Sequence, residues 1–395
     1  MKKKTIKDID VSGKRVLVRV DFNVPVDKST GRILDDTRIR AALPTITALR
    51  SAGARVILVS HLGRPDGRVV ESARLRPVAE RLATLLGAPV PCATDVVGES
   101  ARAVVAQLQA GDVAMLENVR FEPGEESNDE SLARALASFA DVFVNDAFGT
   151  AHRAHASTAG IAKFLPAVAG LLMEREIDYL SRIVEHPERP VAAIIGGAKI
   201  SSKIGVLRHL LANVDVLLIG GGMASTFLKA QGVDVGASLV EDDQIPTARD
   251  VMAEAQRRGV TLGLPMDAVV ADRFEADAQA RTVDVADVPD GWMILDVGPR
   301  TVDDYTGKLR GVQTVVWNGP LGVAEWAAFR RGSEAIARYL ADSRATVVVG
   351  GGETVALVQE LGIADRYAHV STGGGASLEF LEGKTLPGVA ALMDA

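Results

Sequence analysis

The sequence contains a single cysteine, Cys92, among 395 residues. One thiol excludes an intrachain disulfide and a zinc site built from several cysteines, and it favours a reducing compartment. The opening residues MKKKTIKDID are basic, but no apolar run follows them, so no secretory signal peptide is predicted. No segment reaches the roughly 18 uninterrupted apolar residues of a membrane span. We therefore expect a cytoplasmic protein.

Aromatic residues are scarce, at 4% of a chain in which 47% of the residues are hydrophobic. The core must then be built from Val, Leu, Ile and Ala, as in parallel sheets covered by helices. Positive charge is also in deficit, because the formal net charge is -7. This balance argues against nucleic-acid or membrane partners, and any anion site must be a local basic cluster. We expect small-molecule substrates and a monomer.

Several catalytic motifs are absent. Gly383-Lys384-Thr385 ends like a Walker A loop, but Leu378 stands where the first glycine of that loop belongs. No Gly-x-Gly-x-x-Gly or Gly-x-Ser-x-Gly motif occurs, and His152 and His155 have no cysteine or acidic cluster nearby in the sequence. P-loop enzymes, dinucleotide oxidoreductases, serine hydrolases and zinc enzymes are therefore disfavoured.

Short β-branched runs alternate with helical patterns along the whole chain. The predicted strands occupy residues 16–22, 55–61, 113–118, 142–149, 191–197, 214–222, 293–299, 314–319, 346–352 and 370–375. The predicted helices include residues 37–51, 74–86, 131–139, 201–212 and 332–341. This alternation predicts an α/β protein with two doubly wound, Rossmann-like parallel-sheet domains joined by a hinge helix.

The length of the chain exceeds the roughly 250–300 residues at which a single core stops growing, which also favours two domains. We predict an N-terminal domain over residues 1–170 and a C-terminal domain over residues 171–370. The hinge is predicted in the helical stretch 167–184, because Pro187 and Pro190 follow it. Residues 371–395 are expected to pack back across the domain boundary.

Basic residues follow several predicted strands or begin a helix in the first half of the chain. If they lie at one edge of a sheet, they form a site for a small polyanion, since guanidinium groups match phosphate and carboxylate oxygens; they are Arg38, His61, Arg64, Arg120 and Arg153. The alternative is that each arginine is a surface or salt-bridged residue and each histidine is structural. Asp21 and Asn23 fit hydroxyl recognition or simply anchor their loop.

Glycines gather at strand ends in the second half. Gly196-Gly197 precedes Lys199 and Lys203, which are spaced to face one side of the start of the following helix. Three glycine triplets, at residues 220–222, 350–352 and 373–375, are able to approach a nucleotide closely, although tight turns also explain a single triplet. Glu353 is placed to hold magnesium on the nucleotide or, alternatively, to act as a helix N-terminal charge, and Glu325 to accept hydrogen bonds from a ribose.

These segments, in this order, closely resemble phosphoglycerate kinases. The matching blocks are RVDFNVP, SHLGRP, NDAFGTAHRAHAS, GGAK with a lysine four residues on, GGGM, VWNGPLGVAE and STGGGASLEFLEGKTLPGV. The resemblance implies reversible transfer of a phosphoryl group from 1,3-bisphosphoglycerate to ADP, by in-line attack across a closing interdomain cleft, with Mg2+ and ATP/ADP. Another carboxylate kinase and a non-catalytic nucleotide-binding protein remain the alternatives.

The resemblance also implies roles for individual residues. The N-terminal domain would bind the triose through Asp21, Phe22, Asn23, Arg38, His61, Leu62, Gly63, Arg64, Arg120 and Arg153. The C-terminal domain would bind the nucleotide through Gly197, Lys203, Gly221, Gly222, Leu239, Leu295, Pro320, Glu325, Gly351, Gly352, Glu353 and Thr354. Arg38, Lys199 and Lys203 would surround the transferred phosphoryl group, and Glu353 would bind the metal.

Three positions depart from the family pattern. Glu353 replaces the usual aspartate at the metal position, which alters the reach of the carboxylate. Ser202 replaces a common acidic residue before Lys203, and we expect it to act as a helix cap. Ile294 replaces a frequent glycine near the adenine, so a tighter nucleotide pocket is expected.

Overall fold

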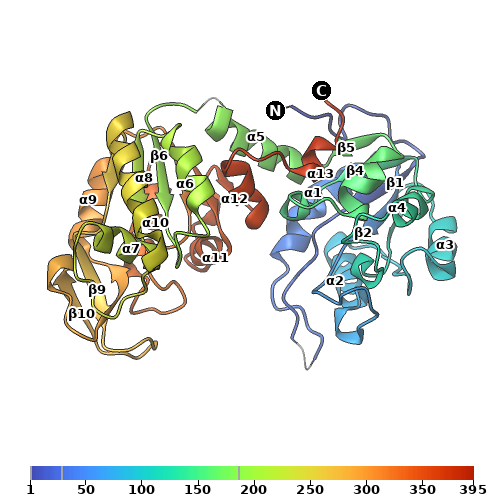
Figure 1. Cartoon of the computed structure of the whole chain (residues 1–395). Helices are drawn as coiled ribbons and strands as arrows, with labels where there is room; N and C mark the ends of the chain where they lie inside the picture. Colours follow the sequence, from blue (N-terminus) through green and yellow to red (C-terminus); the bar gives the residue numbers. More distant parts are fainter. Residues whose placement is uncertain (1, 28–29, 186) are drawn as a thin grey trace. The chain divides into compact units, whose positions relative to one another are not determined.

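The computed structural model describes residues 2–27, 30–185 and 187–395. It divides into two compact units (Figure 1). We call Met1–Asp178 with Thr385–Ala395 the N-unit, and Tyr179–Lys384 the C-unit. The division falls within helix α5 (Leu171–Glu185), so one continuous helix links the two units along the chain.

A five-stranded parallel sheet forms the centre of the N-unit, in the order β3-β2-β1-β4-β5. Its strands are β1 (Arg15–Arg19), β2 (Arg55–Val59), β3 (Val113–Met115), β4 (Val142–Asn145) and β5 (Ala167–Ala169). Its helices include α1 (Thr37–Ser51), α2 (Arg76–Leu86), α3 (Glu99–Ala106), α4 (Glu130–Ala137) and α13 (Pro387–Ala390). The strand order reverses between β1 and β4, and ligands of such sheets bind beyond the carboxyl ends of strands beside a reversal.

The C-unit contains a six-stranded parallel sheet in the order β14-β13-β12-β6-β7-β8. Its strands are β6 (Val191–Ile195), β7 (Val216–Ile219), β8 (Thr261–Gly263), β12 (Thr314–Asn318), β13 (Thr346–Gly350) and β14 (His369–Val370). Its helices include α6 (Ile204–Leu211), α7 (Gly222–Ala230), α8 (Ile245–Arg258), α9 (Pro299–Leu309), α10 (Arg331–Ala341), α11 (Gly352–Glu360) and α12 (Gly375–Leu381). The reversal lies between β6 and β12. The prediction of an α/β protein with two doubly wound parallel sheets is confirmed.

The predicted strand at residues 293–299 does not join the parallel sheet. It forms β11 (Met293–Val297), which pairs antiparallel with β9 (Asp267–Ala271); β9 also pairs antiparallel with β10 (Ala280–Asp284). The prediction was wrong on this point because a β-branched run indicates a strand but not the direction of its neighbour. This small sheet carries Leu295 and packs through its own apolar cluster.

The predicted helix at 167–184 is likewise corrected at its beginning. Ala167–Ala169 forms the edge strand β5, and the helix starts at Leu171 after Gly170. The fully buried Asp146 accepts hydrogen bonds at Oδ1 from the backbone N–H groups of Leu172 and Met173, at 2.9 and 3.1 Å. A Cβ atom on Gly170 would lie 2.1 Å from the same oxygen, so the chain turns into α5 only with glycine at this position.

The C-terminal segment packs into the N-unit. Asn145, at the end of β4, donates from Nδ2 to the carbonyl oxygen of Gly388 at 3.1 Å, and the N–H of Gly388 donates to Ala151 at 2.8 Å. The helix α13 therefore lies against the carboxyl end of β4. Within the described residues, no helix combines the length and apolar composition that crossing a membrane requires.

Candidate active site

Polar side chains that follow β1 and β2 are linked at the carboxyl edge of the N-unit sheet. Asp21 Oδ2 accepts from Arg38 Nη1 at 2.8 Å, and Asn23 Oδ1 accepts from the N–H of Gly63 at 2.9 Å. Phe22 is fully buried and donates its N–H to Ser60 Oγ at 2.9 Å. The structure therefore brings the loop after β1, the loop after β2 and the first turn of α1 together.

Arg120 joins this group from the short helix after β3. Its Nη1 donates to the carbonyl oxygen of Gly63 at 2.8 Å, and its Nε lies 3.3 Å from Glu126 Oε1. Burial lowers the pKa of Arg120, and the positive charges of Arg153 and Arg64 lower it further. These three arginines are therefore close enough to repel one another. Arg64 and Arg153 are exposed, so their charges are available to an anion.

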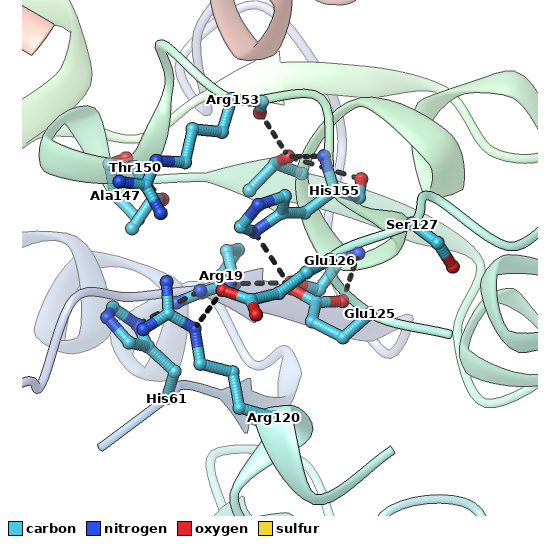
Figure 2. Close-up of polar contacts among 12 residues, drawn as sticks. Arg19, His61, Arg120, Glu125, Glu126, Ser127, Ala147, Thr150, Arg153 and His155 are labelled. Carbon is cyan, nitrogen blue, oxygen red and sulfur yellow. Dashed lines mark hydrogen bonds and ion pairs between the residues drawn. The ribbon is translucent and has the colours of Figure 1, made fainter. Parts of the chain in front are cut away.

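His61 is buried at the end of β2, where Nη2 of Arg19 lies 3.2 Å from its Nδ1 (Figure 2). Burial lowers the pKa of His61 well below its usual range, and Arg19, Arg120 and Arg38 lower it further. The imidazole is therefore neutral at pH 7. Leu62, the next residue, is 6% exposed and packs into the apolar core.

Arg19 is a component of this site that the sequence did not identify. It is fully buried, and its Nε donates to Ser157 Oγ at 2.8 Å. Ser157 in turn donates from Oγ and from N to the carboxylate of the buried Glu125, at 2.6 and 2.9 Å. The available signal was an arginine inside the buried run RVLVRV, since charged residues are rarely buried without partners.

The C-unit brings four glycine-containing turns together at the reversal of its sheet. The N–H of Gly197 donates to Pro320 at 3.2 Å, and that of Gly221 donates to Leu321 at 2.8 Å. Gly221 has a φ of 68°, and a Cβ there would lie 2.6 Å from the nitrogen of Gly197. Gly221 is therefore required by the approach of two backbone turns, which is the turn explanation that the sequence left open.

A cavity of about 270 Å³ opens beside these turns. Of the residues predicted to bind nucleotide, it is lined by Gly197, Gly221, Gly222, Leu239, Leu295, Pro320, Glu325 and Glu353. Ile294 also lines it, as do Ala198, Phe274, Met293, Gly322 and Val323, which the sequence analysis did not name as site residues. Phe274 is 61% exposed, and its ring centroid lies 4.6 Å from that of Trp326.

Four of the predicted nucleotide residues are not among those that line the cavity. Gly351 and Gly352 form the turn into α11, and Thr354 is fully buried, with Oγ1 accepting from the N–H of Gly319 at 3.0 Å. Thr354 thus joins the turn after β12 to the first turn of α11. Lys203 donates to Asn318 Oδ1 at the end of β12. Burial lowers the pKa of Lys203, and the carboxylates of Glu353 and Glu382 oppose that shift.

Two expectations about the segment before α6 were wrong. The helix begins at Ile204, so Lys199 and Lys203 precede it and do not share a face of its first turn. Lys199 is exposed. Ser202 does not cap the helix, because its hydroxyl donates to the carbonyl oxygen of Lys199 at 2.8 Å. The polar residues Ser201, Ser202 and Lys203 form a turn, so the helix starts only at Ile204. The spacing of the two lysines does not indicate this later start.

Two carboxylates, Glu325 and Glu353, line the same cavity. Partial burial raises the pKa of Glu353, the charge of Glu325 raises it further, and Lys203 opposes the shift. A cation beside Glu353 would relieve this repulsion. No group of three or more His, Cys, Asp or Glu side chains with metal-binding geometry occurs in the described parts of the chain.

The family model for phosphoglycerate kinase matches residues 6–384. The chain belongs to the phosphoglycerate kinase family. It is 60% identical over 394 residues to the phosphoglycerate kinase of Pelotomaculum thermopropionicum and 59% identical over 397 residues to that of Roseiflexus sp., in each case over 100% of both chains.

Solved structures agree. The phosphoglycerate kinase from Coxiella burnetii is 42% identical with a TM-score of 0.89, and that from Pyrococcus horikoshii is 33% identical with a TM-score of 0.87. Each comparison covers 98% of this chain and 98% of the other. The protein is therefore a transferase of a glycolytic kinase family, which uses ATP and ADP.

Proposed function

We propose that the protein catalyses the reversible reaction of 1,3-bisphosphoglycerate and ADP to 3-phosphoglycerate and ATP. The observation that carries this proposal is the group of positive side chains at one edge of the N-unit sheet, whose members shift one another's pKa values. A 3-phosphoglycerate molecule carries a phosphate and a carboxylate. A plain carboxylate substrate would not require this many cations, so the site favours the phosphorylated acid.

We assign triose binding to the N-unit edge. Arg64 and Arg153 are exposed and would hold an anionic group directly, while Arg120 is braced by Gly63 and Glu126. Asp21 and Asn23 would accept or donate hydrogen bonds at the triose hydroxyl. Arg38 would be the group nearest the transferred phosphoryl, because its ion pair to Asp21 leaves a partly exposed guanidinium.

We assign nucleotide binding to the C-unit cavity. Its floor of glycine turns admits backbone N–H groups to phosphates, and its apolar residues Leu239, Leu295 and Phe274 suit a base. Lys203, held by Asn318, would reach the phosphates, and Lys199 would approach from the exposed turn. Glu325 would accept hydrogen bonds from the ribose.

The residues present fit a magnesium ion that bridges the protein and the nucleotide. Magnesium is commonly held by one or two carboxylates together with substrate phosphates and water, and Glu353 supplies such a carboxylate. When bound, the ion would neutralise charge on the phosphates. Glu353 is the residue that would hold it.

The chemistry needs no general base from the protein. A carboxylate nucleophile is already ionised at neutral pH, so the task of the side chains is to position the reactants and to neutralise charge. Acyl phosphates hydrolyse readily, so we also propose that the units close around the substrates before transfer, with α5 as the hinge. We place this activity in the cytoplasm and in a monomer.

Calorimetric titration of 3-phosphoglycerate tests the triose assignment. Arg64→Ala and Arg153→Ala should each weaken binding about 10-fold or more, because a charge-assisted hydrogen bond contributes about 1.5–3 kcal/mol. Arg76→Ala is the matched control, since Arg76 is an exposed arginine paired only with Glu80 among the described residues. Unchanged affinity in both site variants would reject the assignment.

A further inference from the structure

Arg19 is the last residue of β1, where it follows three apolar residues, and its side chain is fully buried. Its guanidinium makes contacts in three directions: Nε to Ser157 Oγ at 2.8 Å, Nη1 to the carbonyl oxygen of Val20, and Nη2 to His61 Nδ1 at 3.2 Å. A buried arginine held at three points has little freedom to rotate. It therefore presents Nη2 to His61 in a fixed position.

Ser157 and Glu125 anchor the guanidinium of Arg19 through a chain of hydrogen bonds. Because the hydroxyl of Ser157 accepts from Arg19, its own proton is directed to Glu125 Oε1 at 2.6 Å. Glu125 is 0% exposed, and its negative charge opposes the lowering of the pKa of Arg19 by burial. The chain of contacts thus runs from Glu125 through Ser157 and Arg19 to His61. Figure 2 labels Glu125, Arg19 and His61 in this group.

The direction of the last hydrogen bond follows from chemistry. A guanidinium carries only donors, so Nδ1 of His61 must accept and cannot carry a proton. A neutral imidazole then has its single proton on Nε2. Among the described residues, Arg19 makes the one hydrogen bond to a ring nitrogen of His61. The Nε2–H group is therefore left to donate to a ligand.

We propose that Arg19, braced by Ser157 and Glu125, is a positioning residue that fixes His61 as the neutral tautomer protonated at Nε2. This tautomer makes His61 a hydrogen-bond donor to an anionic oxygen of the triose, a consequence that rests on the proposed function. The tautomer is a property of the free protein. The claim that Arg19 fixes the tautomer and the claim that His61 binds the triose can therefore be rejected separately.

The charges around His61 favour its neutral state. Arg19, Arg120, Arg38 and His155 all disfavour an imidazolium at this position, in addition to burial. The pKa of His155 is itself lowered to about 4, so His155 is neutral near pH 7. Protonation of His61 would place a further positive charge among buried and half-buried arginines.

The first test is the tautomer of His61 in the wild-type protein, read from long-range 1H–15N correlations of histidine-labelled protein without ligand. The histidine signal that disappears from the spectrum of the His61→Gln variant is assigned to His61. We expect Nε2 to be protonated and Nδ1 unprotonated from about pH 6 to about pH 8, a window in which a free histidine titrates. A signal of the Nδ1–H tautomer, or of an imidazolium, would overturn the proposal without reference to substrate.

The second test removes the support of Arg19. Arg19→Met keeps an unbranched stem but removes the guanidinium donor, so both tautomers or a titrating imidazole should appear in the same window. The KM of Arg19→Met for 3-phosphoglycerate, divided by the KM of the wild type at the same pH, should change at least ~3-fold between about pH 6 and about pH 8. The reason is that His61 titrates in the variant and not in the wild type. An unchanged His61 signal and a constant KM ratio would contradict the role of Arg19.

Ser157→Ala provides a milder variant, in which Arg19 keeps its charge but loses one anchor. It should broaden the His61 signal or populate the second tautomer. Ser127→Ala is its control, because Ser127 is exposed and its hydroxyl donates to the carbonyl of Gly124. A Ser157→Ala spectrum like that of the control would count against bracing through Ser157. If the tautomer is as expected but His61→Gln leaves triose affinity unchanged, the triose assignment of His61 fails and the positioning by Arg19 stands.

Discussion

Arg38 and Asp21 form an ion pair of 2.8 Å at the carboxyl end of β1. The contact uses one guanidinium nitrogen of Arg38, whose side chain is 38% exposed, while Asp21 is 12% exposed. Asp21 thus holds the guanidinium at the edge of the sheet without enclosing it. An arginine held in this way is available to a phosphoryl group as charge develops on it.

Arg38→Ala should therefore lower kcat far more than it raises the KM for 3-phosphoglycerate. Loss of one group that stabilises the transition state typically lowers kcat by about 10²–10³-fold, and we expect a change of this size with KM altered by less than ~3-fold. Steady-state kinetics in both substrates measures the split. Arg40→Ala is the control, because Arg40 lies on the same helix and pairs with Asp36. Equal losses in KM and kcat would reject the assignment.

Phe274→Ala should raise the KM for ATP about 10-fold, because stacking of a base on an aromatic ring contributes about 1–3 kcal/mol. The ring lines the C-unit cavity and packs on Trp326, yet it is 61% exposed, so its removal should not destabilise the core. We expect kcat and the KM for 3-phosphoglycerate to stay near wild-type values. Val69→Ala, at an equally exposed apolar residue of the N-unit, is the control. An unaltered KM for ATP would show that the base does not contact Phe274.

Asp146→Asn should make stability less dependent on pH. Burial raises the pKa of Asp146 to about 6, so the native state binds this proton more tightly than the unfolded state does. The resulting stabilisation is fully present below the unfolded pKa of about 4 and is lost as the pH rises through about 6. The variant keeps an oxygen for the N–H groups of Leu172 and Met173.

Relative to wild type, Asp146→Asn should therefore gain stability between pH 4 and pH 8, by up to about 3 kcal/mol. Thermal unfolding at the two pH values measures this difference. Asp365→Asn, at an exposed aspartate, is the control. A difference between Asp146→Asn and wild type that does not vary with pH would contradict the argument.

Glu353→Asp should keep activity but change the magnesium concentration that gives half-maximal rate. The shorter carboxylate withdraws from the cavity that it shares with Glu325, which alters both its reach and the repulsion between the two groups. Rates measured over a magnesium titration at fixed ATP give the comparison. Glu360→Asp, at the other end of α11, is the control. An identical magnesium dependence would remove Glu353 from the proposed metal site.

The sequence predicted those features that depend on local pattern. The helix at 37–51 was predicted with its observed limits, and the polar groups after β1 and β2 were expected at one sheet edge because parallel strands end together. Asp21, Arg38, Asn23 and Gly63 meet there through direct contacts. Glycine turns were expected beside a nucleotide, and those at Gly197 and Gly221 do line a cavity.

The features that were missed depend on partners distant in the sequence. The burial of Arg19 is explained by a hydrogen bond to Ser157, which lies 138 residues away along the chain. The sequence alone does not identify this partner. The antiparallel pairing of β11 depends on β9, and β10 is too exposed to show an apolar pattern. The start of α6 depends on how the turn at Lys199 closes, which the composition of the segment does not specify.

The most direct measurement is the rate at which the purified protein converts ATP and 3-phosphoglycerate into ADP and 1,3-bisphosphoglycerate in the presence of magnesium, with acetate and glycerate assayed alongside. The account predicts a saturable rate with 3-phosphoglycerate that is at least ~10²-fold above the rate with either plain carboxylate, because the arginines of the N-unit select the second anionic group. Comparable rates with all three acids, or none with 3-phosphoglycerate, would contradict it.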